Sequence, residues 1–259
     1  MTHVLVATPA YAHTVSVGYL HSLMQFSNST RMPAWSYDIV SGDSLVTRAR
    51  NLLFSRYVHA RRERGYTHLF WQDDDVAVQG DGLAHIVGLG LDVVGIAYPF
   101  KTYDREWGIP CVVLGAYEQV DRYLVKAKFT GTGALLLSDR AVSALVEHCE
   151  AQGLYADPDD GGPRFYDVFQ TGLRGDMYYS EDWYLCWLLR ELGFEIHVDS
   201  SSSCSHFAGI REHVRPPLEI DPRAIRRSDL TQLPAHVRDH YWTPSDVTLA
   251  YADQSYGDR

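Results

Sequence analysis

Cysteine is scarce in this sequence, with four residues in 259, and no two of them form a Cys-x-x-Cys pair. Neither a disulfide framework nor a zinc knuckle is therefore expected. Long apolar runs are also missing, and Met1 leads into an apolar segment without the basic start of a signal peptide. We expect a protein that has no membrane span and stays in the cytoplasm.

Positively charged residues are also few: the sequence has 23 Lys and Arg residues against 33 Asp and Glu residues, and its formal net charge is -10. This balance argues against a protein that coats duplex nucleic acid, since phosphate binding depends on Lys and Arg. Hydrophobic residues make up 46% of the chain, which is enough for one sizeable core. Residues 1–210 are expected to form one domain, and the proline-rich, charged residues 211–259 an extension packed on it.

Short apolar runs alternate with helical patterns along the first hundred residues, which is typical of βαβ units around a mainly parallel sheet. Two later apolar runs predict an antiparallel pair. The fold class is therefore α/β, with a mixed, mainly parallel central sheet flanked by helices. The expected strands are 3–8 (ended by Pro9), 35–40, 67–71, 92–98, 112–117, 123–129, 134–137 and 194–198. The expected helices are 15–26, 44–64, 139–152 and 181–192, and 155–176 is expected to be loop.

Three consecutive carboxylates, Asp73-Asp74-Asp75, stand where the apolar strand 67–71 ends. Ligands of open α/β sheets bind at the carboxyl ends of the strands. Adjacent carboxylates repel one another unless a cation or solvent relieves them, and hard oxygen ligands suit Mg²⁺ or Mn²⁺. In a strand-like exit, Asp73 and Asp75 would point to one side and Asp74 to the other. A solvated acidic turn is the alternative interpretation.

The helix that begins Thr47-Arg48-Ala49-Arg50-Asn51, followed by the strand and Asp73-Asp74-Asp75, resembles the GT-A superfamily of glycosyltransferases with its Asp-x-Asp element. The likeness covers about residues 3–209. It implies that Asp75 coordinates a metal ion and that Asp73 contacts the metal or the donor, with Asp74 beside them. The start of the chain is similar to the nucleotide-contacting first loop of bacterial and viral members, which implies donor contacts from Thr8, Pro9, Ala10 and Tyr11.

The same resemblance implies roles for residues farther along the chain. Arg50 would reach toward the donor, whereas Arg48 lies about 200° away around the helix and fits a surface salt bridge. The glycine-rich loop Gly131-Thr132-Gly133 would face the donor. In the pair Glu181-Asp182, Asp182 would be the general base of an inverting enzyme, and Glu181 would orient the acceptor. The alternative is that this pair has no catalytic role, because the helix dipole stabilises acidic residues in the first turn of any helix.

Three more residues complete the predicted site. His206, after the last strand, is placed like the third metal ligand of GT-A members. Lys101, in Tyr98-Pro99-Phe100-Lys101, would contact the donor phosphate or sugar. Trp107 would stack on the acceptor sugar. For Tyr98-Pro99-Phe100-Lys101 and Trp107, a loop whose aromatic residues simply pack on the domain is an equal alternative.

The resemblance implies a metal-dependent glycosyltransferase that uses Mn²⁺ or Mg²⁺ and moves a sugar from a UDP-, GDP- or TDP-sugar to an acceptor hydroxyl. Asp182 favours inversion, although the arrangement also resembles retaining fungal mannosyltransferases. The acceptor could be a glycan, a protein or a hydroxymethylated DNA base, as for viral relatives, and a viral enzyme would act in the host cytoplasm. A DNA acceptor would point to Arg223, Arg226 and Arg227 for phosphate contacts.

Two other classes of protein share this kind of fold. Nucleotidyltransferases that make sugar nucleotides begin with a glycine-rich loop containing Arg and Lys, which residues 9–13 do not provide. A non-catalytic carbohydrate-binding protein would not need Asp73, Asp75, Asp182 and His206 together. The sequence therefore favours the transferase.

Overall fold

The computed structural model of the chain describes residues 1–99, 113–159, 162–175, 177–208 and 211–215. The predicted site residues Lys101 and Trp107 lie outside these ranges, as does most of the expected extension at 211–259. No helix in the described part of the chain is both long enough and apolar enough to cross a bilayer.

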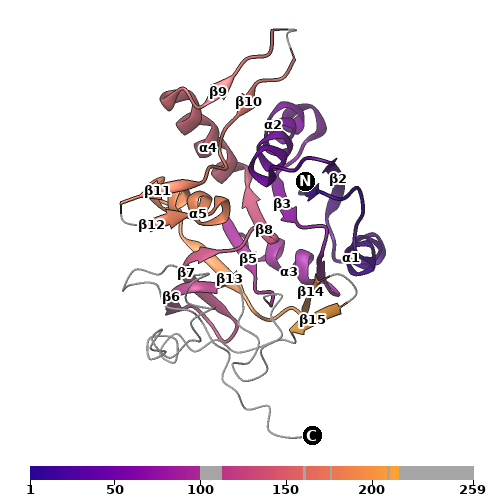
Figure 1. The fold of residues 1–259 in the computed structure, drawn as a ribbon. Helices are drawn as coiled ribbons and strands as arrows, with labels where there is room; N and C mark the ends of the chain where they lie inside the picture. The colour runs from indigo at the N-terminus through magenta and orange to yellow at the C-terminus, as the bar shows by residue number, and fades with distance from the viewer. Residues whose placement is uncertain (100–112, 160–161, 176, 209–210, 216–259) are drawn as a thin grey trace, which may run out of the picture.

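An eight-stranded sheet forms the centre of the molecule, with the strand order β2-β1-β3-β8-β5-β13-β7-β6 (Figure 1). β8 and β7 run antiparallel to their neighbours, and the other six strands share one direction. The mixed, mainly parallel sheet that the sequence predicts is therefore confirmed. The strands are β1 (His3–Ala10), β2 (Ala34–Ser41), β3 (His68–Gln72), β5 (Val93–Ile96), β6 (Val113–Gln119), β7 (Leu124–Thr130), β8 (Ala134–Ser138) and β13 (Ile196–Asp199).

Helices cover both faces of the sheet, which gives three layers with a separate apolar core on each side (Figure 1). Strand side chains alternate between the faces, so Leu69 and Trp71 enter one core while Phe70 enters the other. The first core lies under α2 (Val46–Arg64), α4 (Asp139–Gln152) and α5 (Glu181–Glu191). The second lies under α1 (Val17–Asn28) and α3 (Gly82–Gly88).

The ends of the helices follow their capping residues. Gly65 and Gly153 end α2 and α4 in the left-handed region, with φ of 70° and 68°. At the start of α4, the Ser138 hydroxyl accepts a hydrogen bond from the Ala141 N–H. The predicted bounds of α4 are therefore confirmed, and α2 starts two residues later than expected.

Pro9 does not end β1, contrary to the prediction. The strand continues to Ala10 and keeps its parallel pairing with β2, with Pro9 opposite Val40. On the other side, β1 pairs with β3 only from Val4 to Ala7, so Pro9 lies beyond that ladder. Proline has no N–H to donate, and it is tolerated where a strand is paired on one side only, because that position can face the unpaired side.

A small three-stranded sheet, in the order β15-β14-β4, was not predicted. Its strands are β4 (Val76–Val78), β14 (Cys204–Ala208) and β15 (Arg211–Arg215), and β15 lies in the segment expected to be an extension. β4 follows the acidic run directly, so its pairing with β14 brings residues near 206 beside residues near 75. Strands this short leave little periodicity in a sequence.

The predicted loop 155–176 contains three short strands: β9 (Tyr155–Ala156), which pairs with β10 (Phe165–Tyr166), and β11 (Gly172–Arg174), which pairs with β12 (Met177–Tyr179) directly after the loop. Asn51 of α2 fixes the chain between these pairs. Its side-chain oxygen accepts from the N–H groups of Val168 and Phe169 at 3.0 and 2.7 Å. Its amide nitrogen donates to Asp167 Oδ1 and to the Phe169 carbonyl.

Replacing Asn51 is expected to lower the free energy of unfolding. In Asn51→Ala, two buried N–H groups lose their acceptor, which costs about 2 to 4 kcal/mol in total. Urea denaturation monitored by circular dichroism measures the change. The control Asn28→Ala alters an exposed residue at the end of α1 and should change stability by less than about 0.5 kcal/mol. Equal effects in the two variants would contradict the role of Asn51.

Candidate functional site

The acidic run lies at the carboxyl end of β3, in the middle of the sheet, but it is a tight turn rather than a strand-like exit. The Val76 N–H donates to the Asp73 carbonyl at 3.1 Å, and the Asp73 N–H donates to the Gly133 carbonyl at 3.1 Å. The expectation that alternation along a strand would separate Asp74 from Asp73 and Asp75 was therefore wrong. Each carboxylate of the turn instead has surroundings of its own.

Arg50, buried with 3% of its surface exposed, is the partner of Asp73. Its Nη2 donates to Asp73 Oδ1 at 2.8 Å, and its Nε lies 4.0 Å from Glu181 Oε1. The rings of Trp71 and Phe169, which are in edge-to-face contact with each other, lie on one side of the guanidinium, with centroids 5.8 and 5.9 Å from its central carbon. Arg50 is thus held inside the protein by two carboxylates and two aromatic rings.

Carboxylates outnumber cations around Arg50. Burial alone would lower the pKa of Arg50, but the charges of Asp73, Glu181 and Asp182 raise it above its ordinary value. The Nε and Nη1 atoms of Arg50 are buried without a hydrogen-bond partner. Buried donors of this kind normally have partners, so their presence marks a place where a ligand or water can bind.

Asp182, in the first turn of α5, has a strongly raised pKa. Burial, followed by the charge of the neighbouring Glu181, raises the pKa of its carboxyl group to about 8. Arg50 acts in the opposite direction without offsetting them. Near neutral pH this side chain can therefore both hold and release a proton, which is the property of an efficient general acid or base.

Tyr98 connects the glycine-rich loop to the acidic residues. The Gly133 N–H donates to the Tyr98 hydroxyl oxygen at 3.1 Å. A Cβ added to Gly133 would lie 2.8 Å from that oxygen and 3.1 Å from Asp73 Oδ2, so no larger residue fits. Burial, followed by the charges of Asp73 and Asp182, raises the pKa of Tyr98 well above its ordinary value and keeps the hydroxyl neutral.

Asp75 faces His206 of β14, with 3.3 Å between Oδ1 and Nε2. The other ring nitrogen of His206, Nδ1, donates to the Pro99 carbonyl at 2.7 Å, because a carbonyl can only accept. In neutral His206, Nε2 would then be an unprotonated nitrogen facing a carboxylate oxygen. Two such atoms repel each other, so a proton or a metal ion must lie between them.

The first loop contributes one buried contact near Asp74. The hydroxyl groups of Thr8 and Tyr19 are 2.8 Å apart, and burial together with Asp74 raises the pKa of Tyr19 to about 12. The Ser16 N–H donates to the Asp74 carbonyl. Tyr11 is 68% exposed and lies on the surface.

The remaining predicted residues have simpler surroundings. Pro9 is partly buried and Ala10 is buried at the end of β1. Gly131 and Thr132 are buried before β8, and the Thr132 hydroxyl has no hydrogen-bond partner. Arg48 is paired with Asp43 at the surface, as expected.

The structure therefore brings together two groups of predicted residues that share the acidic turn. One contains Arg50, Asp73, Gly133, Glu181 and Asp182. The other contains Asp75 and His206, and Tyr98 lies between them with its ring edge-on to His206 at 5.3 Å. Among the described residues, no group of three or more His, Cys, Asp or Glu side chains is close enough to hold a metal ion by itself.

Three contributors to the site were not predicted. Tyr98 was noted only as part of the pattern that includes Lys101. Phe169 and Tyr19 have no local signal, because their roles depend on contacts with Arg50 and Thr8 across the fold. Contacts between residues so far apart in the sequence cannot be seen in sequence spacing.

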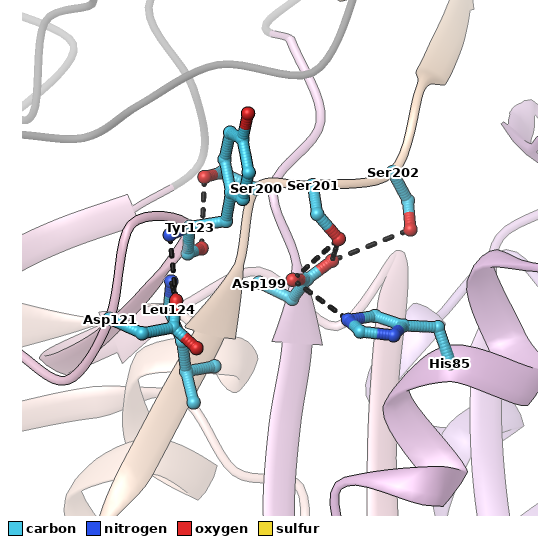
Figure 2. Close-up of polar contacts among 8 residues, drawn as sticks. All are labelled: His85, Asp121, Tyr123, Leu124, Asp199, Ser200, Ser201 and Ser202. Atoms are coloured by element: carbon cyan, nitrogen blue, oxygen red, sulfur yellow. Dashed lines mark hydrogen bonds and ion pairs between the residues drawn. The ribbon is translucent and has the colours of Figure 1, made fainter.

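A polar cluster around the buried Asp199, at the end of β13, fixes the segment that leads to β14 (Figure 2). Both carboxylate oxygens of Asp199 accept from the Ser201 hydroxyl at 2.9 Å, and Oδ1 lies 3.4 Å from Nε2 of His85 in α3. The Ser200 N–H donates to the Tyr123 carbonyl. These contacts set the start of the strand that carries His206.

Comparisons with known proteins give distant structural likenesses only. No family model matches the chain, and no curated protein matches its sequence. The structure named "A197 from STIV" has 15% identity and a TM-score of 0.49, with 86% of this chain and 91% of that chain covered. At these values the likeness assigns no activity.

Two further solved structures are more distant. A glycosyltransferase involved in the glycosylation of the major capsid of PBCV-1 has 9% identity and a TM-score of 0.32, over 54% of this chain and 62% of that chain. A nucleoside-diphosphate-sugar pyrophosphorylase from Vibrio cholerae RC9 has 11% identity and a TM-score of 0.38, over 76% and 91%. Any assignment of function must therefore come from the site itself.

The raised pKa of Asp182 predicts a specific dependence of stability on pH. The unfolded chain releases this proton near pH 4 and the folded chain near pH 8, so the folded state binds more protons between these values. Stability due to Asp182 therefore falls as pH rises through this window. In Asp182→Asn, the free energy of unfolding should decrease less from pH 5 to pH 8 than in the wild type.

Urea denaturation at pH 5, 6.5 and 8 measures this difference. Asp159→Asn, which changes an exposed carboxylate, serves as the control and should follow the wild-type pH profile. If Asp182→Asn also follows the wild-type profile, Asp182 has an ordinary pKa and its proposed chemistry fails.

Proposed function

We propose that this protein is a metal-dependent glycosyltransferase that moves a sugar from a nucleoside diphosphate sugar to an acceptor hydroxyl. The observation that carries the proposal is the Asp75–His206 pair at the carboxyl end of the central sheet. A divalent cation held between Asp75 Oδ1 and His206 Nε2 would take the place of the proton that otherwise lies between these two atoms.

The donor set fits Mn²⁺ or Mg²⁺ bound together with a substrate. A catalytic Mg²⁺ commonly uses one or two carboxylates and completes its shell with phosphate oxygens and water. The Nδ1–H of His206 is held by the Pro99 carbonyl, as for many histidines that bind metals through their other nitrogen. When bound, the ion would hold the diphosphate and stabilise the charge on the departing nucleoside diphosphate.

Arg50 gives Asp73 its orientation in this proposal. The ion pair uses Oδ1 of Asp73, while Oδ2 lies on the side of Gly133, next to the Tyr98 hydroxyl. We assign to Asp73 Oδ2 and the Gly131–Gly133 loop a contact with the donor. Thr8, Pro9, Ala10, Tyr11 and Asp74 then lie on the nucleotide side.

Asp182 is the proposed general base. It takes the proton of the acceptor hydroxyl as that oxygen attacks the anomeric carbon, so the configuration is inverted. A carboxylate with a pKa near 8 is a stronger base than an ordinary one, and a useful fraction is still ionised near neutral pH. Glu181, beside it, orients the acceptor, which we propose to be a glycan, a protein or a modified DNA base.

Donor binding is expected to raise the melting temperature only when a divalent cation is present. In a thermal-shift screen of UDP-, GDP- and TDP-sugars with and without Mn²⁺ or Mg²⁺, a donor at about 100 times its Kd should raise Tm by roughly 5 °C or more. The proposal fails if none of these donors stabilises the protein with either metal.

Replacing Asp75 should remove the part of this stabilisation that depends on the metal. Asp75→Ala takes away one of the two facing ligand atoms, whereas Asp159→Ala removes an exposed carboxylate far along the chain and should leave the shift intact. Metal-dependent stabilisation that persists unchanged in Asp75→Ala would exclude the acidic turn as the metal site.

Replacing Asp182 should separate donor binding from transfer. Asp182→Asn keeps the shape of the side chain, so the donor should still stabilise the protein, while transfer falls by about a hundredfold or more. Release of the nucleoside diphosphate measures the reaction. Full activity in this variant would rule out Asp182 as the base. In a separate assay with a nucleoside triphosphate and a sugar phosphate, release of pyrophosphate would indicate a nucleotidyltransferase instead.

A further inference from the structure

A pocket of about 330 Å³ lies between α1 and the small sheet, on the opposite side of β14 from His206. Its lining includes Val17, His21 and Gln25 of α1, together with Gln79 and Phe207. The pocket is large enough for a small ring-shaped ligand, because binding sites for small molecules start at about 300 Å³.

The lining of this pocket is neutral. None of the described residues that line it is Asp, Glu, Lys or Arg. Apart from His21, a phosphate or a carboxylate would find no side chain of opposite charge here. The chemistry of the lining therefore favours an uncharged ligand.

Two glutamine side chains are already held in place. The Gln25 side-chain oxygen accepts from the Gly80 N–H at 2.7 Å, which leaves its NH₂ group to donate to a ligand. The Gln79 NH₂ group donates to the Ser205 hydroxyl at 3.1 Å, which leaves its carbonyl oxygen to accept. The pocket thus offers a fixed donor and a fixed acceptor, and fixed groups lose less entropy on binding.

Phe207 supplies an apolar wall. Its ring packs so closely on Gly18 of α1 that a Cβ at Gly18 would lie 2.1 Å from a ring carbon. Together with Val17, which is 68% exposed, the ring gives apolar surface beside the two amides. An apolar face with neutral donors and acceptors at its edge matches a sugar ring, which has C–H faces and hydroxyl edges.

The pocket is joined to the proposed reaction site through the backbone. Phe207 and His206 are neighbours on β14 and point to opposite faces. The Phe207 N–H donates to the Asp75 carbonyl at 2.8 Å, so the wall of the pocket and the acidic turn are one hydrogen-bonded unit. A molecule bound in the pocket is therefore separated from the Asp75–His206 pair by strand β14.

We propose that this pocket is a second carbohydrate site, which binds a neutral sugar ring separately from the nucleoside diphosphate sugar. Its use as a recognition site for part of an acceptor glycan rests on the proposed function, whereas the binding of a sugar does not. A site of this kind would let the protein select acceptors that carry a sugar at some distance from the reacting hydroxyl.

Saturation-transfer NMR with the methyl glycosides of glucose, galactose, mannose and N-acetylglucosamine tests the proposal. The experiment uses the full chain without nucleotide or metal, so failure of donor binding does not affect it. At least one glycoside should receive saturation from the wild-type protein. The proposal is overturned if none does at millimolar concentration.

Two independent variants locate the binding. The double variant Gln25→Ala/Gln79→Ala removes one hydrogen bond on each side and should weaken the glycoside by about tenfold. Gly18→Ala favours the helix but displaces the Phe207 ring that forms the wall of the pocket, and it should also reduce binding. The matched control Gln152→Ala changes an exposed glutamine of α4 and should bind like the wild type.

Thermal melts confirm that each variant is folded at the temperature of the measurement. Loss of binding in the double variant or in Gly18→Ala, with binding kept in Gln152→Ala, supports the proposal. Binding that is unchanged in both pocket variants places the sugar elsewhere and overturns it.

Discussion

The site depends on one buried positive charge. Arg50 has 3% of its surface exposed, and such a group is stable only when opposite charges lie close to it. Asp73, Glu181 and Asp182 supply these charges in excess. The pKa of Asp182 is raised by burial first and by the charge of Glu181 second, and Arg50 does not offset them. Arg50 therefore holds the carboxylates close together, but its single positive charge does not neutralise all of them.

The fold explains how residues so far apart in sequence reach the same place. Asp73 follows β3 and Tyr98 follows β5, two parallel strands with only the antiparallel β8 between them. Because β8 runs the other way, its start, with Gly133, lies at the same edge of the sheet as the ends of those strands. The small sheet then adds His206 through the pairing of β14 with β4.

Sequence predicted what depends on local pattern. The alternation of apolar runs predicted the order of most large elements, and the predicted bounds of α4 are those of the structure. It failed at the acidic run, because a three-residue turn and a three-residue strand carry no periodicity. It also could not predict that Tyr98 lies between Gly133 and His206, since that depends on the packing of three strands. The proposed roles of Asp182 and His206 came from resemblance and still depend on experiment.

The most direct test of the account is the position of a bound metal ion. Crystals grown with Mn²⁺ and a nucleoside diphosphate, measured at the manganese absorption edge, would show the ion as an anomalous peak. The account predicts a peak between Asp75 and His206, with Asp73 still paired to Arg50. A peak at another place, with Asp75 and His206 in direct contact, would contradict it.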